Sequence, residues 1–142
     1  MRAIHVFLFL VCVQSLLSAQ SNLPGILSPK EQAEVINDIL EDRLDNLLPQ
    51  LMEREGIDMW ILISREYNED PVMKTMLPAT WLSARRRTMM VFHNTEEGLD
   101  KIAIARYSVG RLLEGQWDVD VFPDQWEALM RIIEKKILQR SA

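Results

Sequence analysis

The sequence predicts an α/β fold in which a mixed β-sheet is flanked by helices. Residues 59–63 form an apolar run between Gly56 and a polar cluster, the pattern of a strand buried on both faces. Two later apolar runs lie on either side of one turn, which is typical of an antiparallel hairpin. Apolar residues at three- and four-residue intervals precede and follow this region and indicate helices. Helices at both ends of a strand and a hairpin imply a mixed sheet covered by helices.

Residues 1–19 are predicted to be a secretory signal peptide. Arg2 supplies the positive start, residues 4–13 are almost wholly apolar, and Ala19 is the small residue that signal peptidase prefers. The apolar run is shorter than the roughly 20 residues that a membrane-spanning helix needs. Cys12, the one cysteine, lies within this run, so we expect it to leave with the signal. We therefore expect a secreted or periplasmic protein that has no disulfide and no membrane contact after cleavage.

The acidic composition argues against nucleic acid as a partner. The chain carries 16 Lys and Arg against 21 Asp and Glu, a formal net charge of −5, and loss of Arg2 makes this balance more negative. Such a surface repels phosphate backbones and anionic membranes. The remaining length is that of one typical domain, which we place at residues 28–142 after an extended lead-in at 20–27.

The first helix is predicted to begin directly after its N-cap Ser28, with Glu31 closing a capping box. Pro49 interrupts its apolar stripe, so we expect either a kink or a second helix over residues 46–55. Gly56 fits the left-handed position after that helix. The stripe consists of Ile36, Leu40, Leu44, Leu47, Leu48 and Leu51.

The middle of the chain is predicted to contain three strands, at residues 59–64, 88–92 and 101–107. Residues 68–84 separate the first two and exceed the usual loop length, so this segment is expected to be functional or to carry a short helix. His93 is expected to be a surface residue of the turn between the second and third strands.

The end of the chain is predicted to contain a short, half-exposed strand at residues 119–122 and a last helix capped by Asp124, with Glu127 in its first turn. Trp117 and Trp126 are expected to pack on the sheet, with contact to another domain as the alternative. The predicted buried stripe of the helix is Trp126, Leu129, Met130, Ile133 and Ile137.

The residue types offer little catalytic or metal-binding chemistry. After cleavage His93 is the only histidine, which rules out His-pair and Cys/His zinc patterns. Glu66, Glu69 and Asp70 match no Ca²⁺ loop, so we expect a solvated acidic loop there. The serines lack a nucleophile elbow, and the glycines form neither a dinucleotide fingerprint nor a P-loop. We therefore expect no catalytic residue and no cofactor in this chain.

Two features suggest binding. Residues 85–87 are three consecutive arginines that could bind a carboxylate or phosphate; the competing interpretation, which we favour, is a cluster that protects an aggregation-prone strand or pairs with the acidic surface. Tyr67, Asn68 and Trp81 could line a peptide-binding rim, although core packing is the commoner fate of a tryptophan.

Residues 44–62 resemble the opening of the N-terminal domain of the creatinase, prolidase and aminopeptidase P family. In that opening a helix with a Leu-Met pair leads through three residues into Gly-Ile-Asp and an apolar strand, as this sequence does. Residues 63–71 and 77–88 look like a secreted bacterial branch of the family. The resemblance extends from about Leu23 to the end and departs after Asn68, where many members continue with Tyr-Leu-Thr-Gly.

The resemblance implies a ribonuclease-H-like α/β domain that precedes a pita-bread catalytic domain. That second domain would bind two divalent metal ions and cleave peptides before proline, and none of its ligand motifs lies in this chain. The implied role of the present domain is contact within a homo-oligomer and formation of a rim that restricts substrate access. The rim candidates are Arg65, Tyr67, Asn68, Trp81 and Arg85.

The sequence thus favours a non-catalytic N-terminal domain of a secreted Xaa-Pro aminopeptidase-like metallopeptidase, present as a fragment or truncated product and inactive by itself. The first alternative is a free-standing binding or assembly module that has lost the catalytic half. The second is a small enzyme that uses the carboxylates and arginines near the first strand, for which the sequence contains no positive indication.

Overall fold

A computed structural model describes residues 25–140, so the predicted signal peptide and most of the lead-in lie outside the described residues. The described residues divide into two units between Gln32 and Ala33, and each is treated by itself. In the first unit, helix α2 (Pro29–Asp42) begins with the predicted capping box. The Ser28 N–H donates to Glu31 Oε2 (2.7 Å), and the Glu31 N–H donates to Ser28 Oγ (3.4 Å).

The predicted interruption by Pro49 is confirmed, and it takes the form of a π-helical segment. After α2 the chain continues through η1 (Arg43–Leu47) into α3 (Leu48–Arg54), and Pro49 lies in the first turn of α3. Proline lacks an N–H and its ring crowds the carbonyl four residues earlier, so a wider turn relieves the strain. Gly56 then ends α3 with φ +65°, as expected, while the Ile57 N–H donates to the Met52 carbonyl (2.8 Å).

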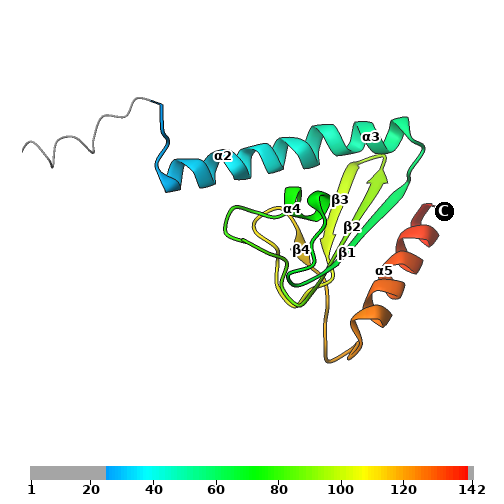
Figure 1. The fold of residues 1–142 in the computed structure, drawn as a ribbon. Coiled ribbons are helices and arrows are strands. Elements are labelled where there is room, and N and C mark those ends of the chain that lie inside the picture. Colours follow the sequence, from blue (N-terminus) through cyan, green and yellow to red (C-terminus); the bar gives the residue numbers. More distant parts are fainter. Residues whose placement is uncertain (1–24, 141–142) are drawn as a thin grey trace, which may run out of the picture. The chain divides into compact units, whose positions relative to one another are not determined.

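Four strands form a mixed sheet in the order β1-β2-β3-β4 (Figure 1). They are β1 (Met59–Arg65), β2 (Arg87–Thr95), β3 (Gly98–Ala103) and β4 (Glu114–Gly115). The β1–β2 and β2–β3 pairs are antiparallel, whereas β4 runs parallel to β3. The predicted mixed sheet with flanking helices and an antiparallel hairpin is therefore confirmed.

The prediction that the first strand is buried on both faces is wrong, because β1 lies at the edge of this sheet and Ile63 is 41 % exposed. The central, fully covered strand is β2, in which every residue from Thr88 to His93 is buried. An apolar run is compatible with either position, since the run itself does not specify how many strands will flank it.

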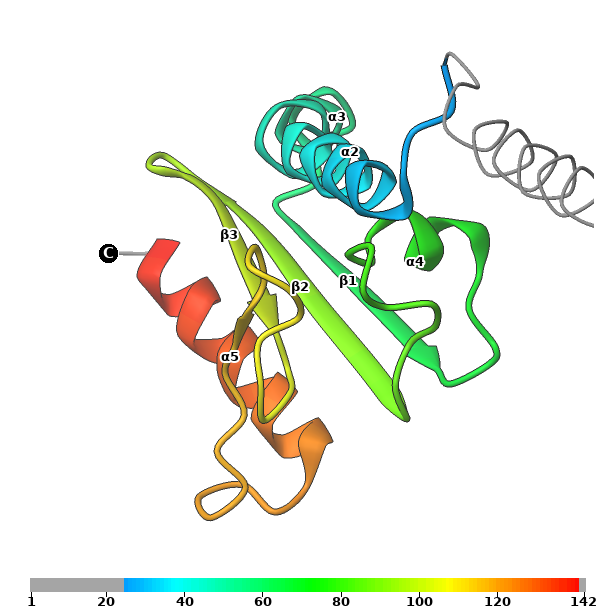
Figure 2. The ribbon, with the colours of Figure 1, turned by 90° about the vertical axis from the view of Figure 1, so that its left-hand side faces the viewer.

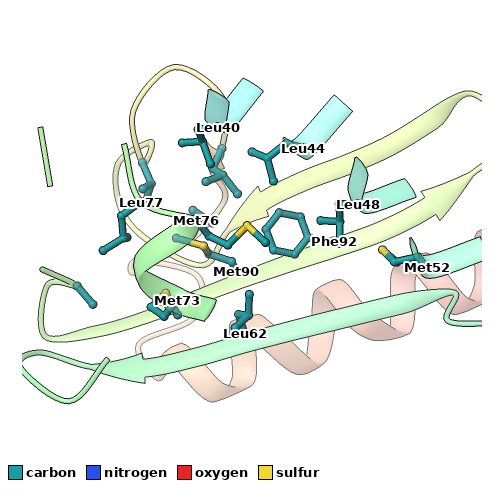
Figure 3. Close-up of a cluster of buried hydrophobic side chains, with 14 residues drawn as sticks. Leu40, Leu44, Leu48, Met52, Leu62, Met73, Met76, Leu77, Met90 and Phe92 are labelled. Carbon is teal, nitrogen blue, oxygen red and sulfur yellow. The ribbon is translucent and has the colours of Figure 1, made fainter. Parts of the chain in front are cut away.

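Helices cover both faces of the sheet (Figure 2). On one face, Leu40, Leu44 and Leu48 pack against Met90 and Phe92 of β2 (Figure 3). On the other face, α5 (Gln125–Arg140) contributes side chains to a second cluster with the alternate residues of β2 and with β3. The members of that cluster are Met89, Val91, Ile102, Ile104, Ala128 and Leu129.

The long segment between β1 and β2 contains the short helix that its length suggested. Helix α4 (Pro71–Thr75) is capped by Asp70, whose carboxylate accepts the Met73 N–H at 2.7 Å. Met73, Met76 and Leu77 are buried against the sheet face that also carries Leu62 (Figure 3). The segment therefore belongs to the core on one side and is free to present side chains on the other.

Two predicted strand assignments are wrong. Residues 119–121 form a turn rather than a strand, because Asp118 Oδ1 accepts the Asp120 N–H (3.0 Å) and the Asp118 carbonyl accepts the Phe122 N–H (2.9 Å). The strand in this region is β4, which lies earlier, and β3 ends at Ala103 rather than at residue 107.

The helical stripes are narrower than predicted. In α5 the Asp124 carboxylate caps the helix by accepting the Trp126 N–H (3.0 Å), as expected. The buried apolar residues of this helix are Ala128 and Leu129, and Ile132 and Ile133 are partly buried against the same cluster. Residues of both stripes that were expected inside and lie exposed are Ile36, Leu47, Trp126, Met130 and Ile137. A helix that packs on a sheet buries mainly the row of side chains that faces the sheet. The apolar side chains on either side of that row therefore remain accessible to solvent.

Candidate functional site

The five predicted rim residues lie at one end of the sheet, at the end of β1 and on the segments that connect it to β2. Arg65, the last residue of β1, pairs with Arg87, the first residue of β2. The segment that leaves β1 and the segment that enters β2 therefore lie next to each other at this end of the sheet. The first of these segments carries Tyr67 and Asn68, and the second carries Trp81 and Arg85.

Two glutamates tie these segments to each other. Glu66 Oε2 accepts the Arg86 N–H (3.2 Å), and the Glu66 N–H donates to the Arg86 carbonyl (2.6 Å). Glu69 Oε1 accepts the N–H groups of Tyr67 (3.2 Å) and Ala84 (2.6 Å). Hydrogen bonding to its own backbone N–H, and then to those of Ala84 and Tyr67, lowers the pKa of the Glu69 carboxyl. The predicted solvated acidic loop is therefore held by backbone hydrogen bonds.

Trp81 and Arg85 are the rim candidates that touch each other. The Arg85 guanidinium lies 4.9 Å from the centre of the Trp81 ring, which also contacts the Tyr107 ring at 6.1 Å. Tyr67, in contrast, is 83 % exposed and has φ +60°. Asn68 is fixed through its backbone, since its N–H donates to the Arg65 carbonyl (3.0 Å) and its carbonyl accepts the Ser64 hydroxyl (3.2 Å).

A hollow of about 610 Å³, which we call the arginine groove, lies at the same end of the sheet. Its lining includes four arginines and two aromatic rings: Arg85, Arg86, Arg87, Arg106, Tyr107 and Trp117. Sequence reasoning singled out residues 85–87 but missed Arg106. Arg106 follows β3, whose last residue, Ala103, pairs with Met90 near the start of β2. The antiparallel pairing therefore places Arg106 near residues 85–87.

Three of the four guanidiniums stack on tryptophans. Besides Arg85 on Trp81, the Arg87 guanidinium lies 5.2 Å from the Trp126 ring centre and that of Arg106 lies 5.3 Å from the Trp117 ring centre. The Trp117 indole N–H donates to the Phe122 carbonyl (2.7 Å), which holds the ring in place. Trp81 and Trp117 pack against the two core clusters, whereas Trp126 is exposed, and each of the three rings carries one guanidinium.

The buried Gln125 lines the groove and connects two of its backbone segments. The Gln125 side-chain amide donates to the carbonyls of Arg87 (3.2 Å) and Ile104 (2.6 Å), so it joins the start of β2 to the segment after β3. Gln125 is also the first residue of α5. Gln125 of α5 therefore holds the backbone at Arg87 and, two residues before Arg106, at Ile104.

His93 is not the surface turn residue that was expected. It is buried within β2, opposite Asp100 of β3, and its Nδ1 lies 3.5 Å from Asp100 Oδ2. Lys136 of α5 donates to the same carboxylate oxygen at 2.7 Å. Burial would raise the pKa of Asp100, but the hydrogen bond and charge of Lys136, together with His93, outweigh burial and lower it. β2 can continue past His93 because the Asp100 carboxylate gives the buried imidazole a polar partner.

Within residues 25–140 no group of three or more His, Cys, Asp or Glu side chains is arranged to hold a metal ion. In the same part of the chain no helix combines the length and apolarity needed to cross a membrane. Comparison of the chain with protein-family models, with curated proteins and with solved structures found no match.

Proposed function

We propose that the chain is a non-catalytic N-terminal domain of a secreted Xaa-Pro aminopeptidase-like metallopeptidase, in which it supplies subunit contacts and a rim beside a catalytic cleft. The family comes from the resemblance of residues 44–88, and the ribonuclease-H-like form of the sheet belongs to the same proposal. The observation that carries the rim is the stack of Arg85, Trp81 and Tyr107, and Tyr67 on the segment after β1 is exposed as well. Such rings and cations suit contact with peptides.

Exposed aliphatic side chains on α2 support the proposed subunit contacts. Val35, Ile36 and Ile39 of α2 are 43–51 % exposed, and Leu47 at the end of η1 is 47 % exposed. Apolar patches of this kind usually mark surfaces that another protein covers. In the full-length parent, the proposed intramolecular partner is the pita-bread domain with its two divalent metal ions. The proposed partner of the exposed α2 surface is a second subunit.

The reading frame downstream of codon 142 provides the first test of this proposal. A continuous frame that encodes the Asp, Asp, His, Glu and Glu ligand set would support it. A natural stop followed by unrelated sequence would instead favour the free-standing assembly module, for which the exposed α2 surface is the specific observation.

Kinetics provide the second test. The chain alone should show no metal-dependent turnover of Xaa-Pro peptides with Mn²⁺, Co²⁺ or Zn²⁺. In the full-length parent, Trp81→Ala and Arg85→Ala should each lower kcat/KM about tenfold, since they remove substrate contacts of the order of 1.4 kcal/mol. The matched control is Arg131→Ala, an exposed arginine that pairs with Glu134 on α5. Turnover by the isolated chain, or wild-type kinetics in both rim variants, would contradict the proposal.

A further inference from the structure

We propose that the arginine groove binds a short acidic segment of a protein chain through its carboxylates. This inference does not depend on the metallopeptidase assignment, because it rests on charge and geometry at residues 85–87 and Arg106. The carboxylates would lie along the groove, and Tyr107 and Trp117 would contact the apolar parts of the segment.

The first argument is that positive charge in the groove is uncompensated. Of the described residues that line it, Glu66 carries the only carboxylate, and Glu66 already accepts the Arg86 N–H. Within residues 25–140 none of the four groove arginines forms an ion pair, whereas Arg111 pairs with Asp38 and Glu41, and Lys136 pairs with Asp100. In a chain with a net charge of −5, four arginines that line one hollow without an ion-pair partner among the described residues are a specific concentration of positive charge.

The second argument is that the guanidiniums are oriented before a ligand arrives. Stacking on Trp81, Trp126 and Trp117 restrains Arg85, Arg87 and Arg106, which lowers the entropy lost on binding. A stacked guanidinium still offers its in-plane N–H groups, and that fork matches the two oxygens of a carboxylate. The geometry is therefore suited to several bidentate contacts at once.

The third argument selects the kind of ligand. A volume of about 610 Å³ lies within the roughly 300–1,000 Å³ of pockets that hold small ligands or a few side chains. Nucleic acid and anionic membrane carry extended negative charge, which the acidic remainder of this chain repels beyond the groove. A segment with two or three carboxylates experiences mainly the local positive field, and its backbone can lie against the aromatic walls.

The test is fluorescence anisotropy of the purified chain with a labelled peptide that contains four glutamates and one tyrosine, and with the same peptide carrying glutamine at those four positions. We expect the glutamate peptide to bind at least tenfold more tightly at low ionic strength and to weaken as salt is added. The double variant Arg86→Gln/Arg106→Gln should weaken binding at least tenfold. Neither position belongs to the proposed peptidase rim, so the outcome is separate from that proposal.

A matched control removes the same charge elsewhere. Arg54→Gln/Arg131→Gln replaces two exposed arginines that pair with Glu55 and Glu134, and it should change binding less than twofold. Arg86→Lys/Arg106→Lys keeps the charge but loses the fork, so it should weaken binding severalfold while circular dichroism reports an unchanged fold. Equal binding of the two peptides, or equal loss in the control variant, would overturn the proposal.

Competition distinguishes the ligand class. Inorganic phosphate at millimolar concentration and a single-stranded oligonucleotide are added to the preformed complex with the glutamate peptide. Displacement by either at a lower concentration than unlabelled peptide requires would reassign the groove to phosphate. Displacement only by the peptide supports the acidic segment.

Discussion

Single residues join the layers of this domain where apolar packing alone leaves polar groups to be satisfied. Gln125 joins two strand regions through their carbonyls, and Asp100 joins β2 to α5 through His93 and Lys136. These hydrogen bonds are buried or partly buried. Removing one partner therefore leaves the other group poorly hydrated and without a hydrogen bond, which destabilises the fold.

Asp100 should make stability depend on pH on the acid side. Because its pKa is lowered on folding, its contribution is fully present above the unfolded value and is lost as pH falls through the folded value, which lies below the ordinary 3.8. At pH 7 Asp100→Asn should cost about 1 kcal/mol, a value that allows for solvent screening. Urea unfolding of both proteins between pH 7 and pH 2.5 measures this, and a difference that persists unchanged at pH 2.5 would refute it.

Gly115 is a residue at which any side chain meets backbone. A Cβ there would lie 2.5 Å from the Tyr107 carbonyl carbon and 2.9 Å from the Ser108 nitrogen. Gly115→Ala should therefore destabilise the chain by about 2 kcal/mol, as overpacking does. The neighbouring Glu114→Ala is the control, since Glu114 is exposed, and thermal unfolding should separate the two variants. Equal melting temperatures would show that the close approach is easily relaxed.

At the scale of elements, the position of a strand in the sheet decides how much its side chains contribute to stability. β2 has a neighbour on each side and helices over both faces, whereas β1 has a strand partner on one side. Short-range patterns predicted the capping box at Ser28, the helix interruption at Pro49 and the turn at Gly56. They could not rank β1 against β2, because that ranking depends on which segments pair.

Two methionines test the ranking of the strands. Met90→Ala in β2 removes a fully buried side chain and should cost about 3 kcal/mol. Met59→Ala in β1 removes a partly buried one and should cost about 1 kcal/mol. The free energies come from urea denaturation of both variants. A larger loss from Met59→Ala would mean that β1 is the better covered strand in solution.

At the scale of the whole molecule, apolar side chains outside the core are the main indication of protein partners. The part of α2 after Gln32 exposes Val35, Ile36 and Ile39, although Leu40 of the same helix is buried in the core. A surface of this composition favours association in water.

Association through α2 should be sensitive to polar substitution. Ile36→Ser/Ile39→Ser should shift the chain from dimer toward monomer in sedimentation velocity, raising the dissociation constant at least tenfold. Val121→Ser, at an exposed apolar residue on a turn, should leave the distribution unchanged. A wild-type chain that remains monomeric at high micromolar concentration would contradict the proposed subunit contact.

The sequence by itself determined the features that depend on neighbouring residues along the chain. These are the start of α2 at its capping box, the disturbance at Pro49, the left-handed Gly56 and the β2–β3 hairpin. Each follows from steric limits or hydrogen bonds that span only a few residues, so a linear pattern contains the necessary information.

Only the tertiary structure decided which strand is central, that His93 is buried beside Asp100, and that Arg106 completes a groove with residues 85–87. It also decided that Met130 and Ile137 remain exposed. The physical reason is the same in each case: burial and charge proximity are set by contacts between distant segments, and the pairing of β2 with β3 creates those contacts.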